Sequence, residues 1–131
     1  MAIRIQAINT YRPKIELGNR ALTDDLVALV ARSTGLNEGT IQQVFTETRD
    51  AVQFFNLRGQ AVYLEGLGTY SPNIELDGTF GISHRADMKL KNVLNTPGAF
   101  SGNIANRENI GKSSDELVAL WNADHPDDPV S

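Results

Sequence analysis

A long amphipathic stretch in the first half of the chain restricts the possible folds more than any other feature. It runs from Asn37 to Gly59, and its apolar residues recur at helical spacing. These residues are Ile41, Val44, Phe45, Ala51, Val52, Phe54 and Phe55. Asn37 is a suitable N-cap and Gly59 a suitable stop, so the stretch predicts one helix of about six turns.

A shorter helix is predicted immediately before it. Thr23 is the expected N-cap and Gly35 the expected end. Asp24 and Asp25 complement the positive end of the helix dipole. So short a helix cannot cover the three phenylalanines of its neighbour, and we therefore expect a homodimer with a shared apolar core. The residues expected in that core are Phe45, Val52, Phe54 and Phe55.

The residues after the long helix have the alternation and turn signals of antiparallel strands. Residues 61–65 predict a first strand, which ends at a glycine pair, Gly66 and Gly68, that permits a bend or a close backbone approach. The next strand contains Pro72, which places part of it at a sheet edge.

Asp77-Gly78 then marks a hairpin turn. We expect a loop of odd length, because it would pair Leu76 with Phe80 and Ile74 with Ile82 and so keep the apolar residues on one face.

Both ends of the chain extend beyond this set of elements. The alternation of Ile3, Ile5 and Ala7 predicts a strand within an N-terminal extension, residues 1–20. Residues 84–112 form a long irregular segment. The capping box Ser113-x-x-Glu116 then predicts a short helix in residues 113–131, followed by an acidic, frayed tail.

From Leu22 to Leu76, the order of these features resembles the HU and integration host factor family of bacterial architectural DNA-binding proteins. The segment Gly66-Leu67-Gly68-Thr69-Tyr70 is similar to that family's signature of glycine, aromatic or aliphatic, glycine, polar and aromatic residues. The resemblance implies an α+β fold, in which a helical hairpin base and an antiparallel β-ribbon form an intertwined homodimer over residues 21–112. It also implies binding in the DNA minor groove with kinking of the duplex.

The charge distribution departs from the basic surface usual in that family. The net charge is −4, and the hairpin expected to form the arm contains Glu75 and Asp77 without a basic residue. The nearest match to the family's Arg-Asn-Pro arm tip, Asn95-Thr96-Pro97-Gly98, lies well beyond this hairpin. We therefore expect DNA binding that is non-specific, weak and salt-dependent. The alternative is an HU-like dimeric structural or protein-interaction module that has lost DNA binding.

Positive charge returns in residues 84–112, which supply the candidate DNA contacts. The odd spacing of Arg85, Lys89 and Lys91 would place them on one face of a strand. A solvated strand face without a ligand is the simpler interpretation of so short a run of charges. The full candidate set is Arg85, Lys89, Lys91, Arg107 and Lys112. Phe80 and Pro97 are candidate intercalating wedges, although core packing for Phe80 and a plain turn for Pro97 are the simpler interpretations.

The chain offers little for catalysis or for a metal. It has no cysteine, and its two histidines, His84 and His125, have no carboxylate neighbours at metal-ligand spacing. Gly111-Lys112-Ser113 lacks the earlier glycine of a phosphate-binding loop, since Asn106 stands there. We expect no enzymatic activity and no cofactor. No apolar stretch approaches the roughly 18 residues of a membrane span, so we expect a cytoplasmic protein, associated with the nucleoid if it binds DNA.

Overall fold

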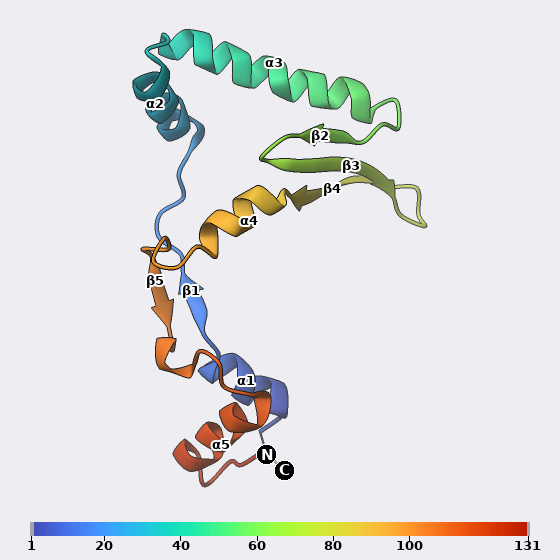
Figure 1. Ribbon diagram of the computed structural model, residues 1–131. Helices are drawn as coiled ribbons and strands as arrows, with labels where there is room; N and C mark the ends of the chain where they lie inside the picture. Colours follow the sequence, from blue (N-terminus) through green and yellow to red (C-terminus); the bar gives the residue numbers. More distant parts are fainter. Residues whose placement is uncertain (1, 131) are drawn as a thin grey trace. The chain divides into compact units, whose positions relative to one another are not determined.

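The computed structural model describes residues 2–130 and has an α+β fold (Figure 1). Its elements are α1 (Arg4–Tyr11), β1 (Lys14–Glu16), α2 (Thr23–Thr34), α3 (Glu38–Asn56), β2 (Val62–Leu64), β3 (Gly68–Ile74), β4 (Phe80–Ala86), α4 (Met88–Leu94), β5 (Asn103–Ala105), the 3-10 helix η1 (Arg107–Asn109) and α5 (Ser114–Asp124). They form two compact units. The central unit comprises residues 21–100, and the terminal unit comprises residues 2–20 and 101–130.

The two predicted helices of the central unit are present. The Asn37 side chain accepts two backbone N–H groups of the first turn of α3, which confirms it as the N-cap. Gly35 ends α2 with a φ of 75°, a left-handed conformation that suits glycine. Thr23 was expected to be the N-cap of α2, but it is the first residue of the helix. The carboxylate of Asp25 instead accepts the N–H of Leu22, the residue before the helix, at 2.8 Å.

Strands β2, β3 and β4 form an antiparallel sheet in that order. β2 pairs only with the first residues of β3. At Pro72 one side of β3 therefore has no neighbouring strand, which agrees with the edge position predicted for this proline. The hairpin loop has the expected odd length, but the predicted pairs are wrong: Ile74 lies opposite Phe80. The reason lies in the turn, where the Asp77 carboxylate accepts the Thr79 N–H at 2.9 Å and centres the turn on Asp77.

This register sorts the hairpin into two faces, because residues opposite one another in an antiparallel pair share a face. The apolar sheet face consists of Tyr70, Pro72, Ile74, Phe80 and Ile82, together with His84, which lies opposite Tyr70 and stacks on its ring. The polar sheet face consists of Thr69, Ser71, Asn73, Ser83 and Arg85. Helix α3 contacts β2 and β3. The long helix therefore packs on the sheet that follows it in the chain.

Residues 84–112 are not the irregular segment that was expected. β4 continues to Ala86, Asp87 caps α4 through its side chain, and a turn follows in which the Ala99 N–H donates to the Thr96 carbonyl at 3.0 Å. β5 and η1 come next and belong to the terminal unit. The central unit therefore ends at residue 100, whereas the HU-like domain was expected to reach residue 112.

The terminal unit brings the two ends of the chain together. The predicted N-terminal strand is wrong, since residues 4–11 form helix α1. Ala7 is fully buried, and Tyr11, one turn later on the same side, packs edge-on against Trp121 of α5. This contact between distant residues favours the helix over the strand. β1 pairs antiparallel with β5, with Lys14 opposite Ala105.

The C-terminal segment is ordered by contacts with α5. Ser113 and Glu116 form the predicted capping box. The residues after α5 were expected to be frayed, but they are held by hydrogen bonds. The Trp121 indole N–H donates to the Asp128 carbonyl at 2.7 Å, and the Val130 N–H donates to Asn122 Oδ1 at 2.8 Å. The tail thus completes the small core around Trp121.

Candidate functional site

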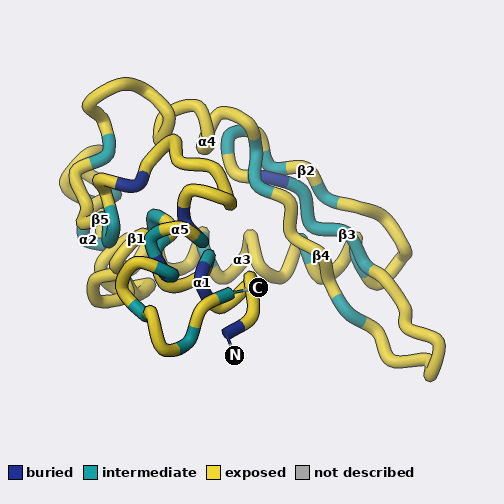
Figure 2. Tube along the Cα trace, turned by 90° about the horizontal axis from the view of Figure 1, so that it is seen from below, coloured by how far each residue is buried: buried dark blue, intermediate teal, exposed yellow. Residues whose placement is uncertain are grey.

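The apolar sheet face and the end of α3 are open to solvent in a single chain. Phe54 and Phe55 of α3 are 52% and 42% exposed, and Phe80 of β4 is 79% exposed. Within residues 21–100, the only buried apolar side chains are those of Val27 and Ile41. Figure 2 shows the β3–β4 hairpin exposed or partly buried along most of its length. Apolar surface this open is typical of a protein interface.

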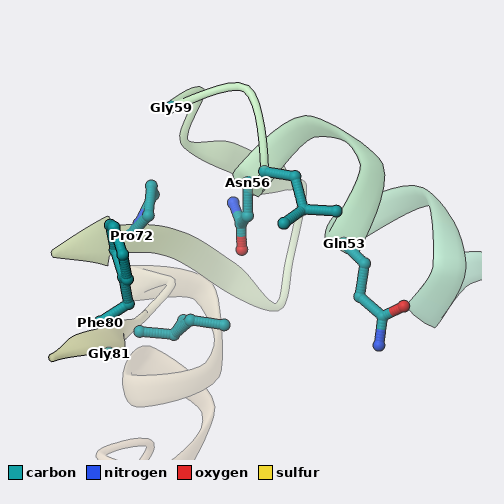
Figure 3. Close-up of a pocket in the computed structure, with 8 residues that line it drawn as sticks. Gln53, Asn56, Gly59, Pro72, Phe80 and Gly81 are labelled. Carbon is teal, nitrogen blue, oxygen red and sulfur yellow. The ribbon is translucent and has the colours of Figure 1, made fainter.

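An apolar hollow of about 530 Å³ lies between the end of α3 and the hairpin (Figure 3). Its lining residues are Gln53, Asn56, Leu57, Gly59, Pro72, Phe80, Gly81 and Ile82. None of these side chains titrates, so the hollow has no acid, base or nucleophile for catalysis. It suits an apolar side chain of another polypeptide better than a reacting substrate.

One polar atom in this hollow has no partner. The Asn56 amide N–H₂ donates to the carbonyls of Gln60 and Tyr70 at 2.9 and 3.2 Å. Its oxygen Oδ1 is buried and accepts no hydrogen bond within residues 2–130. A buried acceptor left unsatisfied costs about 1–3 kcal/mol. The hollow is therefore incomplete in polar as well as in apolar contacts.

The four residues expected in a dimer core divide into two pairs. Phe45 and Val52 are half-buried within the chain, whereas Phe54 and Phe55 are exposed. The rings of Phe54 and Phe55 contact edge to face, with centroids 5.2 Å apart, and the Arg58 guanidinium lies 4.7 Å from the Phe54 ring centre. The exposed pair therefore forms one apolar patch at the end of α3.

The five candidate DNA contacts are not brought together. Arg85 lies on the polar sheet face, but Lys89 and Lys91 lie on α4, so the prediction that these three share a strand face is wrong. The strand ends because Asp87 caps a helix directly after it. Arg107 and Lys112 belong to the terminal unit.

The charges of the central unit are partly paired. The Lys89 ammonium lies 2.7 Å from the Glu65 carboxylate, whereas Arg85 and Lys91 form no ion pair within the described chain. The hairpin itself has Glu75 and Asp77 near its tip and no basic residue between Gly68 and Ser83. Arg85 and Lys91 are therefore the cations of the original set that remain available in this unit.

The two candidate wedges lie in different surroundings. Phe80 is the first residue of β4 and lines the hollow. Its side chain is exposed and is not packed in a core within one chain. Pro97 is the second residue of the Thr96–Ala99 turn, where its restricted φ is favourable. The turn is a sufficient structural reason for Pro97.

The junction of β2, β3 and α4 is organised by Asp87, a residue that the sequence did not single out. Its carboxylate accepts hydrogen bonds from the Lys89 N–H at 2.8 Å, the Tyr63 hydroxyl at 2.7 Å and the Gly66 N–H at 3.2 Å. These hydrogen bonds, of which the one from the Lys89 N–H has the largest effect, hold the pKa of Asp87 below its ordinary value. The hydrogen bond to Asp87 raises the pKa of Tyr63. The available signal was an aspartate directly before the apolar run at residue 88.

The second glycine of the pair is required by close packing. Gly68 is buried with a φ of 149°, and a Cβ at this position would lie 2.3 Å from the Arg85 carbonyl oxygen. Gly66, with a φ of 83°, allows the turn between β2 and β3. The glycine pair therefore serves the close approach and the bend that the sequence predicted.

No family model matches the chain, and no curated protein matches it. Within residues 2–130, no three His, Asp or Glu side chains lie close enough together to hold a metal ion. None of the helices described here combines the length and the apolar character needed to cross a bilayer.

Proposed function

We propose that the chain is an HU-like architectural DNA-binding protein that acts as a homodimer in the cytoplasm, associated with the nucleoid. The order α2, α3, β2, β3, β4, a helical hairpin followed by an antiparallel sheet, agrees with the fold that the resemblance implies. The observation that carries the proposal is the exposure of three large apolar side chains, Phe54, Phe55 and Phe80.

A second copy is the occupant that fits this surface. Each of the three phenylalanines gains about 1–2 kcal/mol when its exposed part is covered, and a twofold interface counts each contribution twice. The sum is comparable with the several kcal/mol that association costs. A donor from the second copy would also satisfy Asn56 Oδ1.

DNA binding rests on cations that a dimer presents twice. Arg85 is exposed on the polar sheet face, away from the apolar surface, and Lys91 is exposed in the last turn of α4. Few phosphate contacts give weak binding that falls steeply with salt, because each contact releases condensed counterions. The acidic hairpin tip is unsuited to follow a phosphate backbone, so contact through these two residues is the mode proposed.

A dimeric structural or protein-interaction module is the second candidate. It is favoured by the acidic hairpin and by the ion pair between Lys89 and Glu65, because a paired Lys89 is less available to a phosphate than the other candidate DNA contacts. In that case the apolar hollow and the hairpin would bind a protein instead of supporting DNA contacts.

Fluorescence anisotropy with a labelled duplex of about 30 base pairs separates the two candidates. The proposal predicts binding at micromolar protein in about 50 mM salt and its loss near 200 mM. The variant Arg85→Ala/Lys91→Ala should bind more weakly, whereas Arg49→Ala, which removes an arginine already paired with Asp50, should bind as the wild type does. Absence of binding at tens of micromolar protein in about 50 mM salt would contradict DNA binding and favour the second candidate.

A further inference from the structure

We propose that the terminal unit has a phosphate-binding surface of its own, which adds to the DNA contacts of the central unit. This inference rests on the proposed DNA-binding function. The surface, here called the basic ribbon, lies along β1 and the segment from β5 to the start of α5 (Figure 1). It comprises Arg12, Lys14, Arg107 and Lys112, all exposed.

Two asparagine side chains hold the segments of the basic ribbon together. The Asn106 amide donates to the carbonyls of Thr10 and Arg12 at 2.9 and 3.0 Å. The Asn109 amide, in a residue only 3% exposed, donates to the Tyr11 carbonyl at 2.7 Å. These bonds fix η1 against the residues that precede β1.

The strand register brings the cations of the two segments near one another. Lys14 lies opposite Ala105, so the chain direction places Arg12 beside the start of η1, where Arg107 lies. Asn106 adopts a left-handed conformation, with a φ of 56°, and is the only non-glycine residue with positive φ in residues 2–130. This uncommon conformation redirects the chain from β5 into η1, so it sets the backbone positions from which these side chains project.

The charge balance of the basic ribbon is positive. Within residues 2–130, none of its four cations forms an ion pair. The neighbouring acids are Glu16 on β1 and Glu108 in η1. Asp115 is paired with Arg4. The Glu116 carboxylate accepts a hydrogen bond from the Ser113 N–H at 3.5 Å, and this bond to a neutral group leaves its charge in place. The basic ribbon therefore has one more cation than unpaired acids.

Duplex DNA fits this surface better than an anionic membrane does. Lys14 and Ile15 alternate along β1, so the apolar pair Ile15 and Ile104 lies on the face opposite Lys14. In the segment from β5 to the start of α5, Ile110 is the one large apolar side chain that is exposed beside the cations. A membrane-binding surface needs apolar side chains beside its cations, to enter the acyl region. Contacts to phosphates need cations and polar groups alone.

The test compares two doubly substituted full-length chains of equal net charge in the anisotropy titration. Lys14→Ala/Arg107→Ala removes one cation from each segment of the basic ribbon, and Arg32→Ala/Arg49→Ala removes two cations outside it. The side chains of Asn106 and Asn109 bond to backbone carbonyls, and neither variant removes a donor or an acceptor of these bonds. Both variants should therefore fold, and far-UV circular dichroism verifies this. If the alanine variant unfolds, Lys14→Gln/Arg107→Gln replaces it.

The basic ribbon predicts at least a tenfold loss of affinity for the first variant in about 50 mM salt, and a slope of log K against log salt that is smaller by about one for each contact removed. The control should stay within about twofold of the wild type. If the wild type binds and the two variants bind equally well, the basic ribbon is overturned while the proposed function stands. If the wild type does not bind DNA, both are overturned. Binding of the wild type to vesicles containing phosphatidylglycerol but not to the duplex would identify a membrane surface and also overturn it.

Discussion

The hydroxyl of Tyr63 donates a 2.7 Å hydrogen bond to the carboxylate of Asp87 and thereby links β2 to the N-terminus of α4. The same carboxylate oxygen accepts the N–H of Gly66, and the other oxygen accepts that of Lys89. One side chain therefore connects strand β2, the glycine turn that follows it and helix α4. This junction sets the position of Lys91 relative to Arg85, the two cations proposed to contact DNA in the central unit.

The ionised form of Asp87 should stabilise the protein at neutral pH. Its pKa in the folded chain lies below the ordinary value of 3.8, so the stabilisation is complete above that value and is lost as the pH falls through the lowered pKa. We expect Asp87→Asn to lower the melting temperature at pH 7, and the difference from the wild type to be smaller at about pH 2.5.

The control for this prediction is Glu47→Gln, the same carboxylate-to-amide change at an exposed position of α3. It should leave the melting temperature almost unchanged at both pH values. A difference for Asp87→Asn that is the same at both pH values would show that its charge is irrelevant to stability.

Gly68→Ala should lower the free energy of unfolding by about 2–4 kcal/mol, because the new methyl group meets a backbone carbonyl and the backbone conformation is strained for alanine. Two matched substitutions separate these causes. Gly66→Ala meets open space but has positive φ, and should cost about 1 kcal/mol. Gly18→Ala has neither problem and should change stability by less than about 0.5 kcal/mol. Urea denaturation measures all three, and equal effects at the three positions would contradict this ranking.

The parts of the fold that were predicted from the sequence are those determined by neighbouring residues. Asn37, Gly35 and the Ser113 capping box act within one helical turn, so α3, the end of α2 and α5 could be identified locally. Helix α1 could not, because five alternating residues resemble a strand, and what favours the helix is packing of Ala7 against Trp121, more than a hundred residues away.

The candidate site was predicted only in part for a similar reason. The apolar residues of α3 and the glycine pair were identified, since periodicity and turn chemistry are local. The strand face expected for Arg85 and Lys89 depended on where β4 ends. Asp87 ends the strand by capping α4, and its contacts with Tyr63 and Gly66, which are distant in the sequence, hold this cap in place. The basic ribbon depends on the pairing of β1 with β5, which no local pattern indicates.

The two units should unfold in separate transitions that two probes can distinguish. Trp121 is the only tryptophan and belongs to the terminal unit, so its fluorescence reports on that unit alone. Circular dichroism is dominated by α2 and α3 of the central unit. Because the proposed dimer interface lies in the central unit, a tenfold dilution should shift the dichroism transition to lower urea and leave the fluorescence transition in place. If the two transitions coincide and both shift on dilution, the two units do not unfold independently and this prediction is contradicted.

Phe54→Ser/Phe55→Ser should weaken dimerisation by at least about a hundredfold, since both side chains are expected in the buried centre of the interface. The matched control is Ile3→Ser/Ile5→Ser, which removes two similarly exposed apolar side chains from α1 and its N-terminal boundary in the terminal unit. Size-exclusion chromatography at several concentrations measures both. Equal behaviour of the two variants would place the interface elsewhere.

Sedimentation velocity of the unmodified chain at tens of micromolar tests the central claim most directly, since the proposed HU-like function requires a second copy that covers Phe54, Phe55 and Phe80. The account predicts one species with twice the mass of the chain. A single species with the mass of one chain would contradict it, and the proposed mode of DNA binding would fall with it.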